Sequence, residues 1–134
     1  MEKEIKHTWF FTQAPQEVWD FLTKPELLEQ WLMKTDFQPV VGHKFRFNCT
    51  SETHGEVLES KPFTRLSYTW KSNSPTSRKL INSTVTWTLT PIDNGTELLL
   101  VHDGFTLLED LIGHNGGWTA CGDRFVQLLK PVTV

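Results

Sequence analysis

Alternation of apolar and polar residues dominates the middle of the chain. From about residue 43 to residue 102, apolar side chains recur at every second position, which is the period of a strand with one buried face. The run from Ile81 to Thr90 is the clearest case, because its mostly apolar face alternates with a threonine-rich face that water can wet. The pattern predicts strands near 43–48, 54–61, 66–71, 81–90 and 96–102. A further strand is expected at 4–12, which is rich in strand-forming residues.

Helical spacing replaces this alternation near both ends of the chain. After Ala14-Pro15 the apolar residues recur at helical intervals, and Pro25 restarts the pattern. Because proline disfavours a helical conformation at the residue before it, we predict two short helices joined at Lys24. The spacing becomes helical again past Gly104.

The last predicted helix carries one apolar stripe. The stripe consists of Trp118, Cys121, Phe125, Leu128 and Leu129. We expect this stripe to be buried against the sheet, and Pro131 to end the helix. The glycines before it, at 113, 116 and 117, are expected to form a loose approach to the helix.

Two segments between strands are typical of turns. Asn94-Gly95 predicts a tight hairpin of type I′, in which both turn residues have positive φ. The polar segment 72–79 contains a proline and predicts an exposed hairpin loop. An antiparallel sheet with one apolar face needs a cover, and the stripe of the last helix matches it. We therefore expect residues 1–134 to form a single α+β domain, in which a curved antiparallel sheet wraps around the long C-terminal helix.

Composition and charge narrow the range of partners. The chain has 134 residues and a formal net charge of −3, which argues against a nucleic-acid-binding protein and its clustered lysines and arginines. No apolar run approaches the roughly 20 residues that span a bilayer, so membrane insertion is not expected. Cys49 and Cys121 lie far apart and form no CxxC pair. We expect both thiols to be free and the protein to be cytoplasmic.

Short motifs occur along the chain in a characteristic order. They are Ala14-Pro15, Val18-Trp19, Pro25-Glu26, Gln30-Trp31, Leu66-Ser67-Tyr68-Thr69-Trp70, Ser83-Thr84-Val85-Thr86-Trp87, Asn94-Gly95-Thr96, His102-Asp103-Gly104-Phe105 and Gly117-Trp118. Together they resemble the SRPBCC superfamily of START-like, helix-grip proteins, in the branch named for the C-terminal domain of the activator of heat-shock protein 90 ATPase. The resemblance covers nearly the whole chain. It implies the helix-grip fold, with a cavity between the sheet and the long helix.

Aromatic residues are the strongest functional signal. The chain has 6 Trp and 9 Phe but only 1 Tyr, so rings either fill the core or line a pocket for a flat apolar ligand. We predict that the protein binds a small hydrophobic or aromatic molecule, with Tyr68 and His102 as its polar contacts. The candidate cavity residues are Phe45, Phe47, Tyr68, Trp70, Trp87, His102, Trp118 and Phe125. The alternative is that the same rings only complete a packed core.

Two other classes of function stay open. A cyclase- or hydratase-type enzyme would need an acid–base pair at the cavity, such as His102 with a carboxylate. A module that contacts a chaperone would instead need an exposed apolar patch. The five histidines lack the helical zinc-site spacing, and the sequence contains neither a GxSxG elbow nor a glycine-rich phosphate loop after a strand. We predict no catalytic residue, metal ligand or cofactor.

Overall fold

One antiparallel sheet and three helices make up the structure. The computed structural model describes residues 4–48, 53–74 and 77–129. The elements in chain order are β1 (Ile5–Phe11), α1 (Pro15–Thr23), α2 (Pro25–Trp31), β2 (Lys34–Thr35), β3 (Lys44–Asn48), β4 (Thr53–Lys61), β5 (Arg65–Asn73), β6 (Leu80–Ile92), β7 (Gly95–Asp103) and α3 (Leu108–Leu128). The seven strands are ordered β1-β7-β6-β5-β4-β3-β2. None of the helices in the described ranges is long and apolar enough to cross a membrane.

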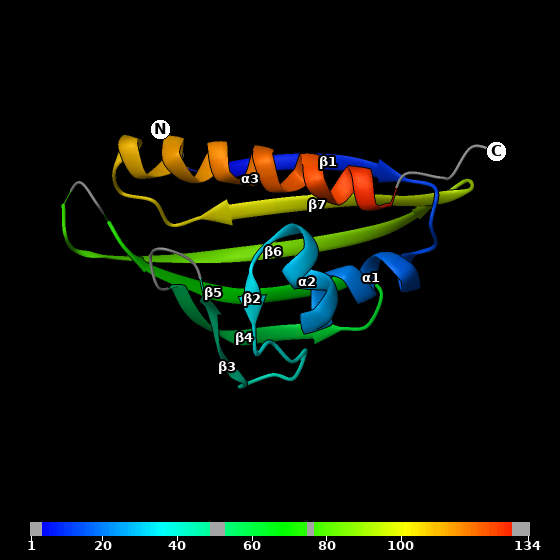
Figure 1. Ribbon diagram of the computed structural model, residues 1–134, viewed down its shortest axis with the longest axis horizontal. Coiled ribbons are helices and arrows are strands. Elements are labelled where there is room, and N and C mark those ends of the chain that lie inside the picture. The colour runs from blue at the N-terminus through cyan, green and yellow to red at the C-terminus, as the bar shows by residue number, and fades with distance from the viewer. Residues whose placement is uncertain (1–3, 49–52, 75–76, 130–134) are drawn as a thin grey trace.

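The sheet is a meander with its first strand moved to the far edge. From β2 to β7 each strand pairs with the next one in sequence. β1 pairs instead with β7, so α1 and α2 carry the chain from one edge of the sheet to the other. Figure 1 shows α3 running along β1 and β7, with α1 and α2 farther down the sheet. The α+β helix-grip fold predicted from the sequence is confirmed.

The helices cover one face of the sheet. Trp87 of β6 packs against Trp31 of α2 and Trp118 of α3, with ring centroids 6.0 and 5.5 Å away. The same face of β6 is buried at alternate residues, as the threonine-rich alternation predicted. The two short helices also form as expected, because Lys24 between them has an extended backbone (φ −86°, ψ 123°). Proline occupies the first turn of both helices, where its missing N–H would have no intrahelical partner.

The long helix begins earlier than the sequence predicted. α3 starts at Leu108, so Gly113, Gly116 and Gly117 lie inside the helix and do not form a loose approach to it. Each glycine destabilises a helix interior by about 1 kcal/mol relative to alanine. Tertiary contacts on this segment outweigh that effect, since Asp110 in the first turn is buried against β5 and its loop. The prediction of a loose approach was therefore wrong, because it relied on the low helix propensity of glycine alone.

Two smaller expectations were also wrong. Leu128 is 40% exposed, because the buried stripe of α3 continues from Phe125 to Leu129 and passes it by. The hairpin between β6 and β7 forms, but Ile92 pairs with Gly95, so its turn residues are Asp93 and Asn94. Only Asn94 of that pair has positive φ (62°). Gly95 is required for another reason, since a Cβ there would lie 1.9 Å from the backbone oxygen of Phe11.

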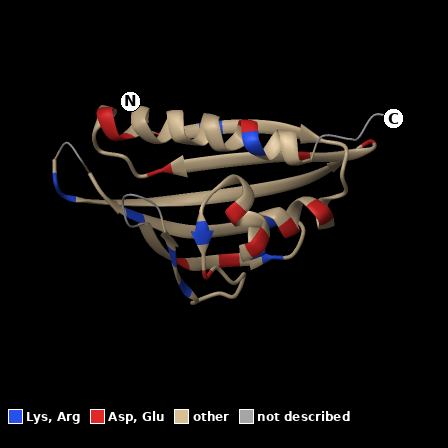
Figure 2. Cartoon of the chain, viewed as in Figure 1, with Lys and Arg blue, Asp and Glu red and all other residues tan. Residues whose placement is uncertain are grey.

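Charges are unevenly distributed over the helices. Figure 2 shows acidic residues gathered on α1, on α2 and at the start of α3. Between Asp110 and Asp123, α3 carries no Lys, Arg, Asp or Glu. This stretch contains four glycines and Trp118, and part of it lines a pocket against the sheet.

Candidate functional site

A pocket of about 320 Å³ lies between the N-terminal half of α3 and the sheet. Its other walls come from β4, β5 and the end of α2, and we call it the α3 pocket. It is lined by Leu32, Met33, Thr53, Trp70, Ser72, Asn73, Glu109, Asp110, Gly113, His114, Gly117, Trp118 and Cys121. The volume is at the lower end of the roughly 300–1,000 Å³ that small-molecule sites occupy.

Two glycines of α3 keep the pocket open on the helix side. Gly113 and Gly117 are one helical turn apart and both line it. A Cβ added at either position would meet nothing within 4 Å. Glycine is therefore not required there by crowding or by a left-handed backbone, and its effect is to leave space. Gly116 has equally open surroundings but is absent from the lining.

Two indole rings form the aromatic wall. Trp70 projects from β5 and Trp118 from α3, with ring centroids 5.4 Å apart and planes inclined at 51°. Trp118 is held in place, because its Nε1–H donates a hydrogen bond of 2.9 Å to Nδ1 of His102. Both rings are almost completely buried. The wall is therefore rigid and apolar apart from the second indole N–H, that of Trp70.

His102 completes a chain of hydrogen bonds behind this wall. Since its Nδ1 accepts from Trp118, the neutral ring carries its proton on Nε2, which donates to the Ser83 hydroxyl at 2.8 Å. Ser83 in turn donates to the backbone oxygen of Trp70 at 2.8 Å. Burial, helped by nearby His114, lowers the pKa of His102 to about 3. This histidine is a neutral, fully hydrogen-bonded core residue.

Two residues on the sheet side of the pocket each carry a buried polar atom that has no hydrogen-bond partner. In the described part of the chain, the buried side-chain nitrogen and oxygen atoms without a hydrogen-bond partner are Trp70 Nε1, Ser72 Oγ and Gln13 Oε1. The first two both belong to residues that line the α3 pocket. Trp70 and Ser72 are each 5% exposed and lie two positions apart on the same face of β5. Buried polar groups are nearly always paired, so this coincidence marks the pocket.

The helix side of the pocket is acidic. Asp110 is buried and its carboxylate accepts a hydrogen bond of 2.8 Å from the Ser74 hydroxyl. The backbone oxygen of Asp110 accepts from Nδ1 of His114 at 2.9 Å, which orients that ring. Glu109 adds a second carboxylate at the exposed mouth, and the lining contains no lysine or arginine. An anionic ligand would therefore meet two carboxylates, with the His114 imidazole as the basic group of the lining.

Comparison with known proteins identifies the family. Residues 12–130 match the family described as activator of Hsp90 ATPase homolog 1-like protein. The chain belongs to this family. The sequence motifs therefore led to the correct branch of the helix-grip proteins. No curated protein matches the chain.

Solved structures agree with this assignment. Protein MLL2253 from Mesorhizobium loti is 34% identical, with a TM-score of 0.88 over 98% of this chain and 99% of that one. The Aha1 dimer from Colwellia psychrerythraea is 19% identical, with a TM-score of 0.80 over 95% and 96%. CalU16 from Micromonospora echinospora is 23% identical, with a TM-score of 0.80 over 96% and 76%. The last two likenesses show the shared fold.

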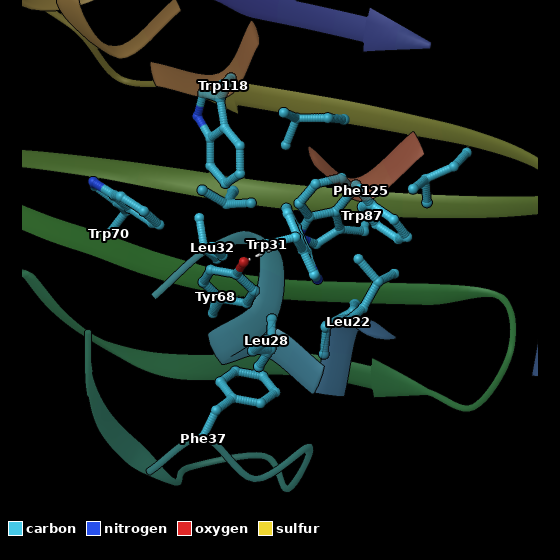
Figure 3. Close-up of a cluster of buried hydrophobic side chains, with 14 of the residues drawn as sticks. Leu22, Leu28, Trp31, Leu32, Phe37, Tyr68, Trp70, Trp87, Trp118 and Phe125 are labelled. Atoms are coloured by element: carbon cyan, nitrogen blue, oxygen red, sulfur yellow. Dashed lines mark hydrogen bonds between the residues drawn. The ribbon is translucent and has the colours of Figure 1, made fainter. Parts of the chain in front are cut away.

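In this family member the predicted cavity residues divide into three groups. Trp70 and Trp118 line the α3 pocket, whereas Phe45 borders a separate polar hollow formed by β3, β4 and β5. The others are buried among the aromatic rings; they are Phe47, Tyr68, Trp87, His102 and Phe125. Figure 3 shows Trp87 and Phe125 inside the cluster and Trp70 at its margin, with the Trp70 nitrogen turned away from the other labelled rings.

The two predicted polar contacts are already occupied. The hydroxyl of Tyr68 accepts a hydrogen bond of 3.0 Å from Trp87 Nε1–H, and burial raises the pKa of Tyr68 far above its usual range. His102 is satisfied on both nitrogens, as described above. A direct contact between a ligand and either residue remains a prediction, and neither belongs to the pocket lining.

Several lining residues were missed from the sequence. Ser72 was assigned to a loop, although it continues the alternation of Tyr68 and Trp70 along β5. Asp110 and His114 were missed because the helix was expected to begin later. The signal was present, since stepping back from Trp118 by four residues reaches His114 and then Asp110.

The site residues do not suggest a metal centre. Within the described ranges, no group of three or more His, Cys, Asp or Glu side chains could hold a metal ion. Cys121 is a free thiol whose pKa is raised by burial and partly restored by Arg124. The other cysteine of the thiol prediction, Cys49, lies outside the described residues, as do Lys130 and Pro131.

Proposed function

We propose that the protein binds a small, flat, apolar molecule in the α3 pocket. The observation that carries the proposal is the open space beside Gly113 and Gly117, in a pocket walled by two indoles. Alanine at either position would stabilise the helix by about 1 kcal/mol, so each glycine leaves open space at a cost in helix stability. The affinity would come mainly from burial of apolar surface against Trp70, Trp118 and Leu32.

The family supports a small-molecule role only at the level of fold. DynU16, from the dynemicin biosynthetic locus, is 20% identical with a TM-score of 0.84. The match covers 97% of this chain and 48% of that chain. Its name associates this fold with a biosynthetic setting. The name Aha1 on another neighbour associates the fold with a chaperone activator family, and a chaperone contact stays an alternative.

An enzyme of the cyclase or hydratase class is the second alternative for the same pocket. The sequence pointed to His102 as its base, but His102 is absent from the lining and its lowered pKa keeps it neutral. The carboxyl and imidazole groups that line the pocket are those of Glu109, Asp110 and His114. A reaction at this site would therefore involve His114 in place of His102.

Indole N–H signals in NMR spectra test the proposal. Titration with small flat hydrophobic probes should shift Trp70 and Trp118 more than Trp31 and Trp87, which lie in the core. Affinity in the micromolar range is expected, equivalent to about −8 kcal/mol. A broad panel of probes that moves none of these signals would contradict the proposal.

A matched pair of variants shows whether the pocket is the site. Gly117→Ala places a methyl group in the pocket and should weaken binding, while Gly116→Ala makes the same chemical change outside the lining. Both should raise helix stability by similar amounts. Equal affinities of the two variants and the wild type would place the bound probe elsewhere.

A further inference from the structure

We infer that the ligand of the α3 pocket is an uncharged aromatic molecule whose acceptor oxygen receives a hydrogen bond from Trp70 Nε1–H. This inference rests on the proposed function and specifies the chemistry of the ligand. It comes from two features that apolar burial leaves unexplained: the unpaired polar atoms on β5 and the charge of the lining.

The indole of Trp70 differs from those of Trp31, Trp87 and Trp118. Trp31 donates to the backbone oxygen of Phe21 at 2.9 Å, and Trp87 and Trp118 donate to Tyr68 and His102. Trp70 Nε1–H has no acceptor among the described residues. An indole N–H can only donate, so the missing partner must be an acceptor. The donor is already unpaired without a ligand, so a ligand that supplies an acceptor gains affinity over one that does not.

Ser72 provides a second unpaired polar atom on the same face of β5. Its hydroxyl is buried and unpaired, and it follows Trp70 on the inward face of β5. A carbonyl oxygen has two lone pairs and can accept from both residues. The pair therefore favours a ketone, amide or ester oxygen over a lone hydroxyl, which offers its own proton as well.

The charge of the lining disfavours the most common alternative acceptor, a carboxylate. Asp110 is buried in the pocket wall and Glu109 stands at its mouth, with no lysine or arginine among the lining residues. An anionic ligand would be repelled by the two carboxylates and would lose its hydration. A neutral acceptor satisfies Trp70 without this penalty.

Three naphthalene probes of similar size separate these possibilities. 2-Acetylnaphthalene carries a neutral acceptor, 2-isopropylnaphthalene has nearly the same shape without one, and 2-naphthoate is anionic. We expect the ketone to bind roughly tenfold more tightly than the hydrocarbon, which corresponds to one unsatisfied hydrogen bond. The naphthoate should be the weakest of the three. Titrations are followed by the indole N–H signals of Trp70 and Trp118.

Two variants assign the preference to its donors. Trp70→Phe keeps an aromatic ring but removes the N–H, and Ser72→Ala removes the hydroxyl. Trp70→Phe should abolish the ketone preference, and Ser72→Ala should reduce it, while the affinity for the hydrocarbon changes little. Ser67→Ala is the control, because Ser67 is on the opposite face of β5, where its hydroxyl contacts Thr86. It should keep the full preference.

The outcomes distinguish this inference from the proposed function. If none of the probes shifts Trp70 or Trp118, the binding proposal fails for this class. If the ketone and the hydrocarbon bind equally, or if the preference survives in Trp70→Phe, binding stands and the acceptor inference is overturned. Tightest binding of the naphthoate overturns the charge argument.

One measurement needs no ligand. Because Trp70 Nε1–H has no protein acceptor, its proton should resonate at higher field than the indole protons of Trp31, Trp87 and Trp118, since a hydrogen bond deshields the donor proton. A Trp70 signal as far downfield as the other three would show that it is already paired. That result would remove the basis of the inference even if Trp70→Phe fails to fold.

Discussion

Gly122 and Gly117 are five residues apart on α3, and a side chain at the two positions would meet opposite surroundings. A Cβ at Gly122 would lie 2.6 Å from the ring of Trp9 on β1, whereas one at Gly117 would meet nothing within 4 Å. The C-terminal half of the helix is thus pressed against the sheet and α2. The N-terminal half stands off and leaves the α3 pocket. One residue type serves close packing in one half and open space in the other.

The aromatic contacts follow the same division. Phe125, in the packed half, lies 4.4 Å from the Trp31 ring and 4.9 Å from the Phe11 ring by centroid. In the open half Ile112 is 59% exposed. The lesson is that a regular amphipathic stripe does not imply uniform packing along a helix. Stability should therefore depend on one half of α3 and binding on the other.

The largest expected effect is in the packed half. Phe125→Ala should lower the free energy of unfolding by about 3–5 kcal/mol, because it removes a buried ring and leaves a cavity. Ile112→Ala in the open half should change it by less than about 0.5 kcal/mol. Urea denaturation of both variants measures the difference. Similar losses for the two would show that the halves are packed alike.

Acidification should weaken the boundary between the halves, where Trp118 contacts His102. The folded-state pKa of His102 is about 3, below the unfolded value of about 6.5, so the unfolded chain binds the proton first. The stabilisation is complete above pH 6.5 and is lost as the pH falls toward 3. Between pH 7 and pH 5 this corresponds to roughly 2 kcal/mol.

A pH series of denaturant melts tests this expectation. The same series on His102→Gln subtracts the contribution of all other titrating groups. Parallel pH dependence in the two proteins would contradict a neutral, buried His102. NMR offers a direct check, since the His102 ring signals should stay at their neutral positions down to pH 5.

The glycines give effects of opposite sign within one helix. Gly122→Ala should destabilise the protein by about 1–3 kcal/mol, because the Trp9 ring must shift to admit a methyl group. Gly113→Ala should instead stabilise it by about 1 kcal/mol, since its surroundings are open. Thermal melts of the two variants measure the difference, since both make the same glycine-to-alanine change in the same helix. Destabilisation by both would mean that the space beside Gly113 is filled.

The smallest effect concerns Leu128, where the sequence and the structure disagree. The stripe predicted a core position, and a core leucine would lose about 2–5 kcal/mol on replacement by alanine. With 40% of the residue exposed, we expect Leu128→Ala to cost below about 1 kcal/mol. Leu129→Ala, which truncates the buried neighbour, is the matched comparison. A larger loss of unfolding free energy in Leu128→Ala than in Leu129→Ala would show that Leu128 is a core residue, as the sequence predicted.

Periodic patterns were sufficient for the fold and for part of the site. Alternation on β5 and β6 and the proline boundaries of α1 and α2 depend on local chemistry, so the strands, helices and aromatic cluster could be predicted. Trp70 and Trp118 followed from the same patterns. These features read directly from the sequence because a buried face imposes its period on the chain.

The rest of the site depends on contacts between distant segments. Three closely spaced glycines oppose a helix locally, and the contact of Asp110 with Ser74 is invisible in the sequence. The role of His102 could not be predicted either, since its neutrality requires Trp118 and Ser83 on two different elements. Whether a ring faces a pocket or the core is likewise decided by which helix segment lies opposite.

The glycines also have a consequence for motion. They lower the local stability of residues 108–117, and the α3 pocket leaves this segment with few buried apolar contacts. Its backbone amides should therefore exchange with solvent through local opening more often than those near Phe125. A molecule held between Trp70 and this segment would bind only the closed form and suppress the opening. Amide exchange in the first turns of α3 should then slow whenever the pocket is occupied, and this slowing would report binding.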